Sequence, residues 1–168
     1  MKIPWRKHAF KKKQEEKQIC IPETALNLVK QAECAICLPH ELTILECDCI
    51  VKAMRSYTQN SNADFLFIKE DIRTKLSIHS AFDLNNFIFD HVYAAPVSEC
   101  LLTHEPSGNS LYWDGDDKFC SISGTRQFCR TAYPHDHEIL WYYYLHATLN
   151  EFEDEEELEA YFIQLTKL

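Results

Sequence analysis

Apolar residues recur at helical spacing in the first third of the chain. The run that follows Pro22 has apolar positions every three residues and predicts a helix over 22–33. Pro39 suits the first position of another helix, and the spacing behind it is closer to 3.6 than to 2, so a second helix is predicted over 39–57. The two apolar faces consist of Leu26, Val29 and Ala32, and of Leu42, Leu45, Cys49, Val51 and Met54.

The spacing changes to 2 from residue 63 onward. Apolar and polar residues alternate over 72–79, as in a half-buried strand, and the runs 65–68 and 87–93 are rich in β-favouring residues. Three glycines then divide the chain into short runs, because glycine adopts the positive φ of tight turns. These runs predict three strands and one hairpin turn, namely 100–104, 110–113, 118–123 and Asp114-Gly115. We therefore predict an antiparallel β-meander of about five or six strands over residues 63–123.

Helical spacing returns after Gly124. A short helix over 125–133 is expected to stop at Pro134, and Asp136 can cap the next helix. A last helix begins in the acidic run 151–157, which suits the positive end of the helix dipole. Its buried stripe is predicted to consist of Leu158, Phe162 and Leu165.

The segregated order of helices, strands and helices predicts an α+β fold. The sheet is expected to pack against N-terminal helices (22–57) and C-terminal helices (124–166). A chain of 168 residues is long enough for one core. We expect a basic N-terminal extension (1–19) followed by a single α+β domain (20–168).

Composition indicates a folded protein, since 46% of the residues are hydrophobic. No run approaches eighteen apolar residues, and the first twenty residues lack the apolar centre of a secretory signal. We expect a cytoplasmic protein in which the eight cysteines are thiols.

Charge is unevenly distributed along the chain. Seven of the seventeen Lys and Arg residues lie among the first seventeen residues, beside two acidic residues. The remainder carries ten basic and twenty-four acidic residues, a formal balance of −14. Such a body repels nucleic acid and anionic membranes and attracts a basic protein. The basic segment is expected to be a solvated extension or to lie against the protein's own acidic residues, with contact to nucleic acid or membrane as the alternative.

Two groups of residues suggest a metal site. The first is Cys34, Cys37, His40, Cys47 and Cys49, which resembles a set of zinc ligands. On a helix over 39–57, however, Cys47 and Cys49 would point about 200° apart, so we expect buried thiols and no bound metal or cofactor.

The second group is His135 and His137, which flank the predicted cap Asp136. A third ligand is missing unless it is His146. We expect an exposed helix start here.

Acidic residues beside aromatic residues are typical of protein interfaces. The acidic turn after Trp113 lacks the ligand pattern of a calcium loop, and the run 141–144 has more aromatic rings than one helix face can bury. The predicted partner-binding residues are Trp113, Asp114, Asp116, Asp117, Tyr142, Tyr143, Glu153, Asp154, Glu156 and Glu157.

No catalytic signature accompanies these residues. The chain lacks a glycine-rich phosphate loop, a G-x-S-x-G elbow, an H-E-x-x-H pair and a dinucleotide-binding fingerprint. We therefore expect no enzyme and no small-molecule ligand.

The function predicted is binding to a basic protein. The profile is typical of small bacterial immunity proteins that neutralise a nuclease-like toxin, because a nuclease must be basic to hold phosphates. The alternatives are a secretion-effector chaperone, which would dimerise, and a zinc- or metal-dependent protein. The latter would use Cys34/Cys37/His40/Cys47 or His135/His137.

Overall fold

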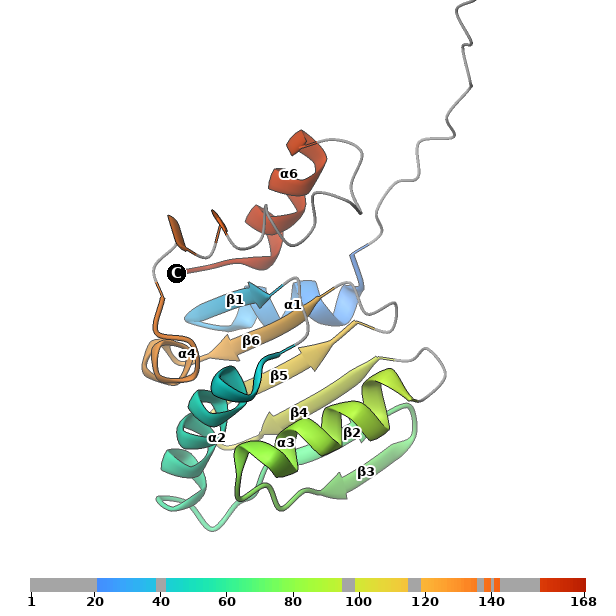
Figure 1. Ribbon diagram of the computed structural model, residues 1–168, viewed down its shortest axis with the longest axis vertical. Helices are drawn as coiled ribbons and strands as arrows, with labels where there is room; N and C mark the ends of the chain where they lie inside the picture. Colours follow the sequence, from blue (N-terminus) through green and yellow to red (C-terminus); the bar gives the residue numbers. More distant parts are fainter. Residues whose placement is uncertain are drawn as a thin grey trace, which may run out of the picture.

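The computed structural model contains a single six-stranded antiparallel sheet with helices packed against it (Figure 1). It describes residues 21–38, 42–94, 99–114, 119–135, 138–139, 141–142 and 155–168, without the side chains of 155–158 and 161. The strands lie in the order β1-β6-β5-β4-β2-β3. This arrangement confirms the predicted α+β class with an antiparallel sheet.

The helices and strands follow one another in a fixed order with these bounds: α1 (Glu23–Gln31), β1 (Cys34–Leu38), α2 (Ile44–Thr58), β2 (Leu66–Lys69), β3 (Ile72–Lys75), α3 (Ala81–Ile88), η1 (Phe89–Tyr93), β4 (Cys100–His104), β5 (Asn109–Trp113), β6 (Cys120–Gly124), α4 (Arg126–Ala132) and α6 (Glu155–Leu165). η1 is a π-helical turn that continues α3.

The predicted meander is present as β4, β5 and β6, which pair in succession. β2 and β3 form a separate hairpin, and α3 carries the chain back so that β4 pairs with the other edge of β2. The short helix after Gly124 is also confirmed as α4, which Thr125 caps by accepting a hydrogen bond from the amide of Phe128.

Strand β1 was not predicted. It lies between the two helices expected over 22–57, and it pairs with β6 along its full length. All five of its residues are buried, so the sequence Cys-Ala-Ile-Cys-Leu shows no alternation of apolar and polar positions. A strand covered on both faces has no period of 2 to detect, which explains the omission.

The strand predicted over 87–93 is wrong, because this run is helical in α3 and η1. Ser80 and Asp83 form a capping box, in which each side chain accepts a hydrogen bond from the backbone amide of the other residue. The cap starts a helix that buries Leu84, Phe87 and Ile88 on one face. The strand predicted over 72–79 is shorter than expected, and β3 is exposed throughout because it is an edge strand.

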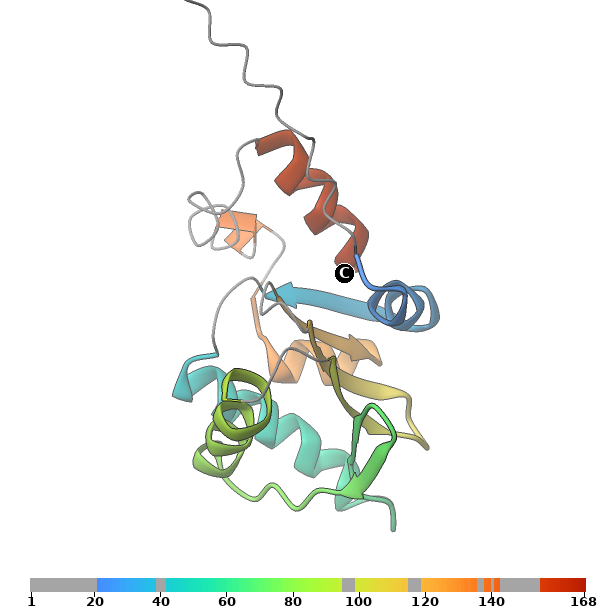
Figure 2. The ribbon, with the colours of Figure 1, turned by 90° about the vertical axis from the view of Figure 1, so that its right-hand side faces the viewer.

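The helices form layers on the two faces of the sheet (Figure 2). α2, α3 and α4 cover one face, and α1 lies on the other, against β1 and β6 (Figures 1 and 2). The chain end completes the β1 edge, because Lys167 and Ala35 exchange backbone hydrogen bonds of 2.7 and 2.6 Å. None of the helices that the structure describes is long and apolar enough to cross a membrane.

The turn from β6 into α4 generates a prediction. Gly124 has φ of +146°, and a Cβ atom there would lie 2.7 Å from the Cα of Asn109. Gly124→Ala should destabilise the protein by about 3 kcal/mol, since backbone strain and a clash with backbone coincide. Gly108 is the matched control, because it also has positive φ (+71°) but open space around it. Gly108→Ala should lower the free energy of unfolding, measured by urea denaturation, by only about 1 kcal/mol. Equal losses for the two variants would contradict the close approach of Asn109.

Candidate functional site

The residues predicted to bind a partner are only partly on the surface. Trp113 and Asp114 are 3% and 7% exposed at the end of β5. The rest of the protein therefore covers most of both side chains, and their role in partner binding stays a prediction. Tyr142 is 59% exposed, so its side chain is accessible to a partner. Outside the described residues or side chains lie Asp116, Asp117, Tyr143, Glu153, Asp154, Glu156 and Glu157.

Six of the cysteines that the structure describes are buried, and Cys49 is partly exposed. Cys34 and Cys37 are three positions apart on β1 and therefore face opposite sides of the sheet. Cys34, Cys37 and Cys47 are all buried, as predicted, whereas Cys49, which was expected on the buried face of its helix, is only partly buried. No group of three potential metal ligands occurs in the part of the chain that the structure describes, which includes His135 but not His40 or His137.

Burial also controls the acidity of these thiols. Desolvation raises the pKa of Cys47 to about 11, and it raises the pKa of Cys120 and Cys129 well above the ordinary thiol value. The Cys129 thiol donates a hydrogen bond to the carbonyl oxygen of Cys34 at 3.3 Å. Thiols that stay protonated at neutral pH are poor nucleophiles and act here as packing groups.

A buried histidine links two serines. His104 is 2% exposed, and its Nε2 lies 2.8 Å from the Ser61 hydroxyl while its Nδ1 lies 2.7 Å from the Ser107 hydroxyl. Ser61 also donates to the carbonyl oxygens of Tyr57 (3.0 Å) and Ala63 (3.2 Å). A hydroxyl has one proton, so we infer that Nε2 carries hydrogen and donates to Ser61. In this tautomer Nδ1 accepts a hydrogen bond from the Ser107 hydroxyl, and Ser61 has no base to activate it.

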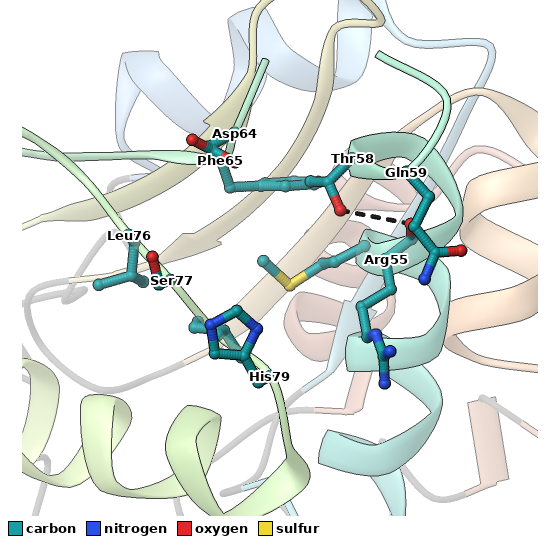
Figure 3. Close-up of a pocket in the computed structure, with 10 residues that line it drawn as sticks. Arg55, Thr58, Gln59, Asp64, Phe65, Leu76, Ser77 and His79 are labelled. Carbon is teal, nitrogen blue, oxygen red and sulfur yellow. Dashed lines mark hydrogen bonds between the residues drawn. The ribbon is translucent and has the colours of Figure 1, made fainter. Parts of the chain in front are cut away.

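A hollow on the described surface lies between the end of α2 and the connection from β3 to α3 (Figure 3). Its volume is 260 Å³. The lining residues are Met54, Arg55, Thr58, Gln59, Asp64, Phe65, Leu76, Ser77, Ile78 and His79. The buried apolar residues Met54, Phe65 and Ile78 contribute to its lining, together with polar and charged side chains such as Arg55, Asp64 and His79.

Two exposed aromatic rings mark a different surface. Phe82 and Phe89 are 66% and 61% exposed. They are seven positions apart, about two helical turns, and so they share the outward side of α3 and the start of η1. Large apolar side chains exposed together are a feature of interaction sites.

Acidic residues border these rings. The Lys69 ammonium donates a hydrogen bond of 3.1 Å to the His91 carbonyl, which holds the β2–β3 turn against η1. The turn presents Glu70 and Asp71, and η1 presents Asp90, all exposed. Glu70 has φ of 52°, as a two-residue hairpin turn requires at a cost of about 1 kcal/mol. We call Glu70, Asp71, Phe82, Phe89 and Asp90 the acidic–aromatic surface.

Sequence reasoning missed this surface because Phe89 fell in a predicted strand. The signal that could have found it is the pair Ser80 and Asp83, spaced as in a capping box. A helix that starts there places Phe82 and Phe89 opposite its buried stripe.

His104 generates a prediction about pH. Burial lowers the pKa of His104 below its ordinary value, so the unfolded chain binds a proton more readily than the folded one. Stability should therefore fall as pH drops below about 6.5, by up to about 1.4 kcal/mol per pH unit, until the folded pKa is reached. The check is urea denaturation from pH 8 to pH 5. His104→Gln should remove this contribution to the slope, whatever it does to stability at pH 8, and an unchanged slope would contradict the assignment.

Burial of the thiols generates a second prediction. Cys49 is partly exposed, whereas Cys47 on the same helix is buried. Iodoacetamide at pH 7.5 should alkylate Cys49 at least about tenfold faster than Cys47, since a buried thiol is both inaccessible and protonated. Peptide mass spectrometry measures both rates in one sample. Equal rates would mean that the first turns of α2 do not pack against the sheet.

A comparison of the chain with protein-family models, with curated protein sequences and with solved structures finds no match in any of the three. The function is therefore argued from the surfaces of the molecule itself.

Proposed function

We propose that this protein binds and neutralises a basic protein, in the manner of an immunity protein that occupies a nuclease-like toxin domain. The observation that carries the proposal is the acidic–aromatic surface: two exposed phenylalanine rings and Asp90 lie on the continuous helix of α3 and η1, and the Lys69–His91 hydrogen bond ties the exposed turn of Glu70 and Asp71 to η1. These carboxylates lie in a body whose formal balance after residue 17 is −14.

The aromatic rings supply the affinity in this proposal. Phe82 and Phe89 present most of their side-chain surface to water. Burial of such a ring in an interface contributes about 1.5–3 kcal/mol. Interface energy concentrates in a few anchors of this kind, with polar residues around them.

The carboxylates supply speed and selectivity. Glu70, Asp71 and Asp90 form no ion pair with any cation of the described residues. Their field attracts a positively charged partner and repels nucleic acid, which would compete for the same toxin surface. Lys69 is the nearby cation, and its ammonium is engaged by the His91 carbonyl.

The prediction concerns association with the product of the reading frame adjacent to this protein's gene. Asp71→Lys combined with Asp90→Lys should slow association about tenfold at low salt and reduce its salt dependence, because two attractive charges become repulsive. Phe89→Ala should mainly accelerate dissociation, with a loss of affinity of about tenfold or more. Stopped-flow fluorescence and surface plasmon resonance measure the two rates.

The matched control changes the net charge by the same amount as the Asp71 and Asp90 pair, but on helices away from the acidic–aromatic surface. Glu23 on α1 and Glu159 on α6 are both exposed, and neither belongs to the acidic–aromatic surface. Glu23→Lys combined with Glu159→Lys should leave association within about twofold of the wild type. If this pair slows association as much as the Asp71 and Asp90 pair, the partner does not bind at α3.

The chaperone alternative predicts that the protein dimerises. A dimer in light scattering would favour that alternative.

A further inference from the structure

We propose that the pocket at the end of α2 binds a small organic acid, whose apolar body enters between Met54, Phe65 and Ile78 while its carboxylate meets the Arg55 guanidinium. The site shares no residue with the acidic–aromatic surface. The proposal is therefore independent of the function proposed above.

Three apolar core residues form the floor of the pocket. Met54, Phe65 and Ile78 are 3%, 1% and 9% exposed. A volume of 260 Å³ is just below the usual range of pockets for drug-sized ligands, about 300–1,000 Å³, so the occupant is small. Methionine adapts its shape to an apolar guest more easily than branched side chains do.

The pocket is held open by contacts outside it. The Phe65 ring is fixed by His104 and Phe128, with ring centroids 5.4 and 6.1 Å away. The connection that forms the other wall is anchored by a backbone hydrogen bond of 3.1 Å from the Leu76 amide to the Phe65 carbonyl. A preformed pocket loses little conformational freedom when it binds a ligand.

Arg55 is the cation that the pocket leaves without a carboxylate. On neighbouring elements Lys52 pairs with Asp48 at 2.5 Å and Lys75 pairs with Asp64 at 3.7 Å. Arg73 likewise pairs with Glu105. Within the described residues no acidic side chain pairs with Arg55, although the protein has an excess of acids. An acid from outside would supply the missing partner.

The rim fixes which way the ligand lies. The Arg55 and His79 side chains lie on one side of the pocket and Asp64 on the opposite side (Figure 3). Thr58 stands beside Arg55 and donates a hydrogen bond to its carbonyl at 3.3 Å (Figure 3). A carboxylate is attracted by the guanidinium and repelled by Asp64, so it points toward Arg55.

The charge of the whole protein selects a monoanion. A phosphate or dicarboxylate would carry a second charge into a strongly acidic molecule, and one guanidinium compensates only one charge. A short carboxylic acid with an aliphatic or aromatic body fits both the apolar floor and the single cation.

The experiment compares three probes that differ only at one end: 4-phenylbutyrate, 4-phenylbutanol and 4-phenylbutylamine. The chain has two methionines, Met1 and Met54, so a methyl-labelled sample gives one NMR signal from the pocket. Titration with 4-phenylbutyrate should shift the Met54 signal to saturation with a Kd of about 1 mM or lower. The alcohol should bind about tenfold more weakly, and the amine should not saturate the signal.

Variants assign the effect to the pocket. Arg55→Gln should weaken 4-phenylbutyrate about tenfold, whereas Lys52→Gln on the same helix, outside the pocket, should leave its affinity unchanged. Ser77→Phe places a ring at the exposed rim and should abolish the shift in a protein that still unfolds cooperatively. The proposal is overturned if the Met54 signal does not saturate, if acid and alcohol bind equally, or if the Arg55 and Lys52 variants behave alike.

Discussion

The structure depends on an aromatic contact at the end of α2, where Tyr57, Phe65, His104 and Phe128 meet. Tyr57 lies 5.8 Å from Phe128, and Phe65 lies 5.4 Å from His104, between ring centroids. These rings come from α2, from the residue before β2, from β4 and from α4, so one cluster joins segments distant in sequence. The cluster requires a neutral imidazole, because the surrounding rings cannot solvate a charge.

This cluster sets the position of the pocket and of the acidic–aromatic surface. Phe65 lines the pocket, and its ring also packs against Phe128 in the core. The same packing fixes α2, against which α3 lies. Once the buried face of α3 is occupied by Leu84, Phe87 and Ile88, Phe82 and Phe89 must face water. The exposure of these two rings is the reason that we propose this surface as a binding site.

Local signals in the sequence predicted the elements that they control. Three glycines marked the ends of the β4–β6 meander, and Thr125 with Pro134 bounded α4, because turns and caps act over a few residues. The prediction failed where tertiary contacts decide. β1 reads as an apolar run without a period, and only its pairing with β6 makes it a strand. The run 87–93 has β-favouring residues, yet the cap at Ser80 carries the helix through it.

The sequence by itself determined the fold class, the short helix after Gly124 and the sign of the charge, because composition and short-range signals require no knowledge of distant neighbours. It could not show that Trp113 is buried or that Phe89 is exposed, although both are aromatic residues close to acids. It could not single out Arg55, which, unlike Lys52 and Lys75, lines the pocket and pairs with no carboxylate of the described residues. Only the tertiary structure decided these points, since burial and pairing depend on which distant segments the sheet brings together.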